Sequence, residues 1–146
     1  MEPDAFVKQL DDARIVAAIR EAEARSRGEI RVHVSARPVA DARAGAEATF
    51  ARLRMADTAE RNGVLLFLAP ASRTFAVIGD RGIHERVSEG FWEAVAAAAR
   101  AELEAGRFTE AIVAAVSTVG EALARHFPRQ SGAGDANELP DAVSRD

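Results

Sequence analysis

Cysteine is absent from this 146-residue chain, and its absence excludes several kinds of site at once. Disulfide bonds, zinc sites built on thiolates and thiol nucleophiles all require cysteine. Long hydrophobic runs are missing too, because the longest, at residues 64–70, has only the length of a strand. A membrane-spanning helix needs roughly 18 apolar residues. We therefore expect no membrane insertion.

The chain also lacks a strong excess of charge. Its formal net charge is −4, from 19 basic and 23 acidic residues that are spread along the sequence. Nucleic acid binding needs a concentrated basic face, so we expect no nucleic acid partner. Residues 1–4 are acidic and lack the basic start of a secretory signal, which predicts a cytoplasmic location.

Sequence motifs for familiar cofactors are absent as well. The chain has no HExxH pair, no nucleophile elbow and no glycine-rich phosphate loop. Gly132 and Gly134 follow no predicted strand, so they do not form a nucleotide-binding fingerprint. We expect no nucleotide, no haem and no zinc thiolate site.

The residues that are present are typical of one soluble domain, with 48% hydrophobic and 29% charged. Their periodicity predicts helices near residues 11–28, 41–53, 88–106 and 108–127, a short helical stretch at 83–87, and strands at 29–35, 64–69 and 74–78. Ser88 is the expected N-cap of the helix that follows it. His33, in the first strand, is expected to lie half-buried under a helix.

The order of these elements predicts a mixed sheet. A helix joins the first two strands, which makes them parallel, and a tight turn at residues 70–73 makes the third strand antiparallel. Residues 64–69 are apolar on both faces, so this strand should be central, with helices on both sides. We predict an α/β fold, a three-layer α/β/α sandwich, over residues 1–128, and a flexible C-terminal tail over residues 129–146.

Strand direction brings several polar residues to one rim of the predicted sheet. The three at strand ends are Glu29, Asn62 and Asp80. The residues that flank them are Asp57, Glu60, Arg81 and His84. Oxygen donors of this kind suit a hard cation such as Mg²⁺ or Ca²⁺, which can hold a phosphate and activate water. We predict that the metal ligands are Glu29, Asn62, Asp80 and Asp57.

Two other roles for these residues stay open. Asp80 is the candidate catalytic residue, as a nucleophile or general base, with Arg81 binding a phosphoryl oxygen. Alternatively, Glu29 and Asp80 cap helices or pair with Arg27 and Arg81, as charged residues at strand ends often do.

Four segments of the chain carry a resemblance to a known family. They read SRGEIRV at residues 26–32, TAERNGVL at 58–65, IGDRGI at 78–83 and FTEAI at 108–112. Together they resemble the TPM domain family over about residues 12–129, and residues 137–141 resemble the tail of its short bacterial members. The resemblance implies an α/β/α sandwich, divalent-cation binding and, for some members, phosphatase activity.

We expect a divalent-cation-binding interaction or regulatory module that uses Ca²⁺ or Mg²⁺ and docks on a protein partner. The absence of a catalytic His, Cys or Ser constellation favours this non-catalytic role. The alternative is a metal-assisted phosphatase that acts on phosphomonoesters, so the sequence leaves enzymatic activity open.

Overall fold

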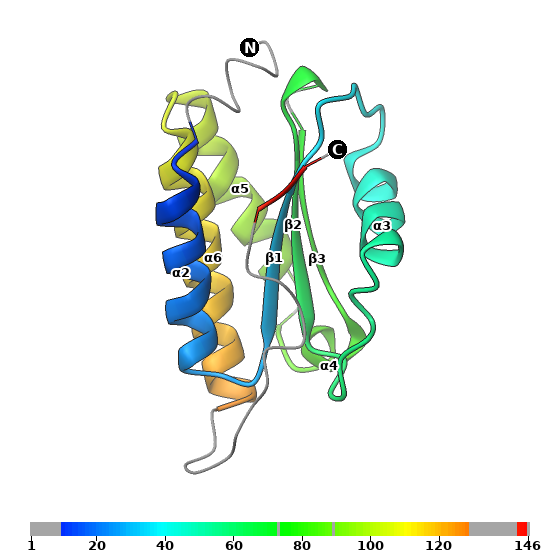
Figure 1. The fold of residues 1–146 in the computed structure, drawn as a ribbon, viewed down its shortest axis with the longest axis vertical. Helices are drawn as coiled ribbons and strands as arrows, with labels where there is room; N and C mark the ends of the chain where they lie inside the picture. The colour runs from blue at the N-terminus through cyan, green and yellow to red at the C-terminus, as the bar shows by residue number, and fades with distance from the viewer. Residues whose placement is uncertain (1–9, 73, 89, 129–142, 146) are drawn as a thin grey trace.

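The computed structural model describes residues 10–72, 74–88, 90–128 and 143–145. It has three layers, with a sheet between two layers of helices (Figure 1). The helices on one face are α2 (Asp12–Ala24), α5 (Phe91–Glu104) and α6 (Phe108–His126), and the helix on the other face is α3 (Ala42–Arg52). The predicted α/β/α sandwich is confirmed. None of the described helices is both long and apolar enough to span a membrane.

Within the described residues the sheet has four strands, in the order β3-β2-β1-β4. Their bounds are Glu29–Val34 for β1, Gly63–Ala69 for β2, Thr74–Gly79 for β3 and Ser144–Arg145 for β4. β1 and β2 are parallel, and β2 and β3 are antiparallel, as predicted. The sequence did not predict β4, which pairs in parallel with β1. The rest of the predicted tail, residues 129–142 and 146, lies outside the described residues.

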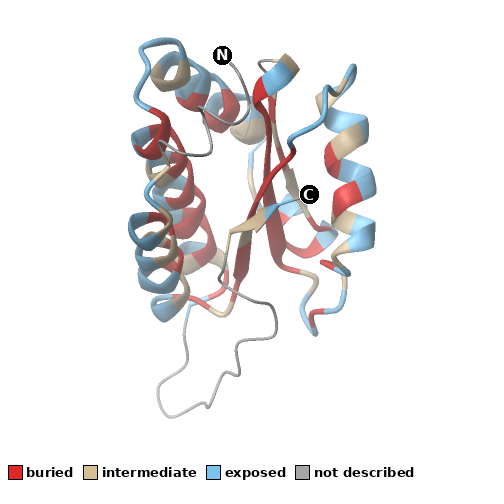
Figure 2. Cartoon of the chain, turned by 45° about the horizontal axis from the view of Figure 1, so that its top comes forward, coloured by how far each residue is buried: buried red, intermediate tan, exposed pale blue. Residues whose placement is uncertain are grey.

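β2 is the centre of the core, and all seven of its residues are buried. Figure 2 shows buried residues along the strands and on the helix surfaces that face them. Alternate residues of β1, such as Ile30 and Val32, join the core under α2, α5 and α6. Because β2 is apolar on both faces, the sheet needs a helix layer on each side.

Two helix starts differ from the predictions. α4 (Arg81–His84) begins two residues earlier than expected, because the Asp80 carboxylate accepts a hydrogen bond from the Arg81 N–H at 2.8 Å and caps the helix. The predicted Ser88 cap is wrong. Gly90, at φ 86°, precedes α5 and makes no side-chain cap. A left-handed backbone is easily adopted by glycine, so the chain turns into α5 at Gly90 without a polar cap.

His33 is more buried than predicted. It is 0% exposed, and its ring stacks on Phe67 with 5.8 Å between the centroids. Its Nδ1 lies 2.9 Å from the Ser144 Oγ in β4. The expected half-buried position is therefore wrong, because the unpredicted C-terminal strand packs against this side chain.

Candidate functional site

Glu29, Asn62 and Asp80 lie at the same rim of the sheet, as their strand directions predict. Glu29 pairs with Gly63 in the β1–β2 ladder, and its N–H donates to the Asn62 carbonyl at 3.4 Å. From the other side, the Asp80 N–H donates to the Gly63 carbonyl at 2.8 Å. The start of β2 is therefore held between the start of β1 and the end of β3. In Figure 1 this rim is the lower end of the sheet, beside α4.

Glu29 and Asp80 also share a face of the sheet. Residues directly opposite each other in a ladder point to the same side, and Gly63 lies opposite both. This is the face that α3 covers, and α3 packs mainly on β2 and β3. Gly63 contributes no side chain between the two carboxylates, whose Cα atoms stand about two strand spacings apart, roughly 10 Å.

All three rim residues are buried, which is unusual for polar side chains. Glu29 is 4% exposed, Asn62 1% and Asp80 7%. The Asn62 Nδ2 donates to the Arg27 carbonyl at 3.0 Å, but the Asn62 Oδ1 has no hydrogen-bond partner among the described residues. A buried acceptor left without a donor costs about 1–3 kcal/mol. The Asn62 Oδ1 is therefore suited to bind a ligand.

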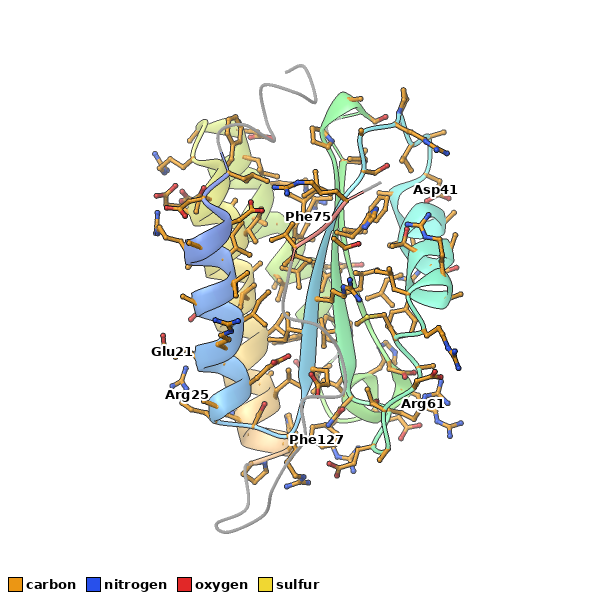
Figure 3. All side chains as sticks on the ribbon, viewed as in Figure 1. Glu21, Arg25, Asp41, Arg61, Phe75 and Phe127 are labelled. Carbon is orange, nitrogen blue, oxygen red and sulfur yellow. The ribbon has the colours of Figure 1, made fainter. Side chains whose placement is uncertain are left out.

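The Asp80 carboxylate is held by Arg61, a residue that the sequence analysis did not single out. The Arg61 Nε donates to Oδ2 at 2.7 Å, and Nη2 donates to Oδ1 at 3.0 Å. These bonds raise the pKa of the Arg61 guanidinium above its ordinary value. Figure 3 shows Arg61 at the lower end of the sheet. Asp80 therefore caps a helix, as the alternative without a cation predicts, but it forms its ion pair with Arg61 and not with Arg81.

The flanking residues have partners of their own. Asp57, a predicted ligand, is exposed, and its Oδ2 lies 2.8 Å from the Arg54 Nε. Glu60 accepts from the Arg27 Nε at 2.8 Å, and this bond lowers the pKa of the Glu60 carboxyl. These two carboxylates therefore lie in exposed ion pairs.

His84, also a flanking residue, has an aromatic partner. The His84 Nδ1 accepts from the Trp92 Nε1 at 3.0 Å. The neutral ring must then carry its proton on Nε2. His84 accordingly orients the indole at the start of α5.

The donor set of the rim fits a hard cation only in part. Its oxygens are two carboxylates and one amide, the types that Ca²⁺ and Mg²⁺ prefer. In the part of the chain that the structure describes, however, no three His, Cys, Asp or Glu residues group closely enough to hold a metal ion. Ca²⁺ takes about six to eight oxygen ligands, so water or a partner would have to supply the rest.

The model of the TPM domain matches residues 2–122. The chain is similar to the NMR structure of BA42 protein from the psychrophilic bacterium Bizionia argentinensis, with 35% identity, a TM-score of 0.84, and coverage of 94% of this chain and 96% of that one. It shares its fold with the N-terminal domain of cg2496 protein from Corynebacterium glutamicum, with 19% identity, a TM-score of 0.61, and coverage of 88% and 80%. No curated protein matches. The chain therefore belongs to the TPM domain family.

Proposed function

We propose that this chain is a divalent-cation-binding interaction domain, with the cation held at the rim formed by Glu29, Asn62 and Asp80. The observation that carries the proposal is the buried Asn62 Oδ1, which has no hydrogen-bond partner in the described part of the chain and belongs to the same rim as two buried carboxylates. A hard cation satisfies such an oxygen and offsets the charge of the carboxylates.

Asp57 remains a predicted fourth ligand, but Glu29, Asp80 and Asp57 do not group closely enough in this structure to hold one ion, so the Asp57 side chain would have to move toward the rim. Its ion pair with Arg54 joins side chains that are 55% and 80% exposed. An exposed pair of this kind contributes about 0–1 kcal/mol, so Asp57 can exchange Arg54 for a cation at little cost. Even with four protein ligands the coordination would be incomplete. We therefore expect weak binding, with a Kd of about 10⁻⁴ M or higher.

Incomplete protein ligation favours an interaction role. A bound cation supplies positive charge and open coordination positions, which carboxylates of an acidic partner can fill. The metal-assisted phosphatase is the less favoured proposal, because the Asp80 side chain is only 6% exposed, which leaves little room for a phosphomonoester to reach it. A nucleophile or general base needs a lone pair within reach of the substrate.

A CaCl₂ and MgCl₂ titration followed by ¹⁵N NMR tests the proposal. We expect shifts at residues 28–30, 60–63 and 79–82 that saturate together. Glu29→Gln should raise the Kd at least roughly tenfold, because a charged ligand becomes neutral. Glu47→Gln is the matched control, since Glu47 is exposed on α3 and pairs with Arg43. The absence of rim shifts up to about 10 mM of either cation would contradict the proposal.

Two further assays separate the roles. A short peptide of alternating Asp and Glu should broaden the rim resonances only when Ca²⁺ is present, because the cation bridges the two sets of carboxylates. Turnover of p-nitrophenyl phosphate that is lost in Asp80→Asn would instead favour the phosphatase.

Asp57→Asn decides whether Asp57 is a ligand, since the loss of a ligand must weaken cation binding.

A further inference from the structure

The Arg61 guanidinium occupies the oxygens through which Asp80 would hold a cation. Among the described residues, Arg61 Nε is the only donor to the Asp80 Oδ2, whereas Oδ1 also accepts from the Arg81 N–H. A planar guanidinium matches both oxygens of a carboxylate and supplies the positive charge that a buried carboxylate requires. Oδ2 is thus the atom that the departure of Arg61 would release.

The main chain of Arg61 is fixed independently of its side chain. Its φ is 52°, in the left-handed region that residues with a Cβ seldom adopt. Its carbonyl accepts a hydrogen bond from the Gly82 N–H at 2.8 Å. The Arg61 side chain, in contrast, is 36% exposed. The guanidinium can therefore turn into water while the backbone of the rim stays in place.

We propose that Arg61 is a tethered counter-cation of the rim, which holds Asp80 when no divalent cation is bound and leaves Oδ2 when one binds. The inference rests on the proposed function, because it concerns regulation of the same site. A guanidinium and a divalent cation repel each other and compete for the same lone pairs, so they exclude each other at Oδ2. The apparent affinity for the cation is then lowered by the free energy of the Arg61–Asp80 pair.

The test is a Ca²⁺ titration of wild type, Arg61→Gln and Arg81→Gln by ¹⁵N NMR. We expect Arg61→Gln to lower the Kd roughly tenfold, because a charge-assisted pair no longer has to be broken. Arg81→Gln removes the same charge beside Asp80 but keeps the Arg61 pair, so its Kd should change by at most roughly threefold. In wild type, the Arg61 Nε–Hε resonance should shift with the same saturation curve as the backbone of Asn62.

The outcomes separate two claims, that the rim binds a cation and that Arg61 competes with it. If wild type binds Ca²⁺ and Arg61→Gln binds no more tightly, or more weakly, competition is overturned while the cation site stands. An Arg61 Nε–Hε resonance that stays unmoved while the backbone saturates also overturns it. If neither wild type nor Arg61→Gln binds, both claims fail together. Binding by Arg61→Gln alone would support competition and show that Arg61 closes the wild-type site.

Discussion

Replacing Gly82 with alanine tests how closely α4 packs on the loop that carries Arg61. A Cβ at Gly82 would lie 2.1 Å from the Glu60 carbonyl oxygen and 2.6 Å from the Arg61 carbonyl oxygen. Both are backbone atoms, so no side-chain rotation relieves the overlap, and α4 must move away from the loop. That movement breaks the 2.8 Å hydrogen bond from the Gly82 N–H to the Arg61 carbonyl.

The expected loss of folding free energy in Gly82→Ala follows from three contributions. Overpacking costs about 1–3 kcal/mol, and the lost hydrogen bond costs about 1 kcal/mol. Alanine returns up to about 1 kcal/mol of helix propensity. The net loss for Gly82→Ala is therefore about 2 kcal/mol, which lowers the Tm of a domain of this size by about 4–8 °C.

Thermal unfolding followed by circular dichroism measures this loss, with Gly106→Ala as control. Gly106 has φ 81° and no atom within 4 Å of the added Cβ, so its substitution adds backbone strain but no overlap. That strain costs about 1–2 kcal/mol. A Gly82→Ala protein that melts within about 1 °C of wild type would refute the reasoning, because two backbone oxygens would then have given way without cost.

Three other predictions concern the core, the tryptophan and the response to acid. Leu66→Ala should cost about 2–5 kcal/mol in urea unfolding, because Leu66 is 0% exposed in the central strand, and a loss below about 1 kcal/mol would contradict this. Gly79→Ala places a Cβ 2.3 Å from the Trp92 Cζ2, so the emission of the chain's only tryptophan should change; an identical spectrum would count against the packing. The hydrogen bond from Arg27 lowers the pKa of Glu60 in the folded protein. The contribution of Glu60 to folding stability is therefore fully present above its usual pKa of 4.5, and it is lost as the pH falls through the lower pKa of the folded state. The stability difference between wild type and Glu60→Gln should therefore shrink in urea unfolding below about pH 4.5, and a constant difference would exclude this linkage.

Local pattern and chain order were enough to predict the layers and the composition of the rim. The alternation in β1 and the fully apolar β2 define strands, and the helix between them requires that they run parallel. Once the hairpin reverses the direction of β3, the residues at 29, 62 and 80 must lie at one end. These inferences need only backbone geometry, which a short sequence pattern determines well.

The partners of the rim side chains could not be predicted in the same way. Arg61 is next to Asn62 in sequence, yet a flexible arginine can reach many acceptors, and its left-handed backbone, at φ 52°, is one that the residue type does not predict. β4 has two residues and no hydrophobic periodicity, so it gives no strand signal. The burial of His33 depends on that strand and was missed with it.

In the proposed exchange the backbone of the rim stays fixed and only the Arg61 guanidinium moves, and this limits how a partner protein can detect cation binding. Ladder bonds hold Asp80 and Asn62, and the Gly82 contact holds the Arg61 backbone, so cation binding has little backbone to rearrange. In the proposed exchange, a divalent cation enters as the guanidinium moves into water. The charge placed on the Asp80 carboxylate therefore rises by one, and the net charge of the protein with its bound cation rises by two, while the fold stays the same. A partner that senses this change must respond to electrostatic potential, which is why an acidic peptide, and not an apolar one, is the appropriate probe.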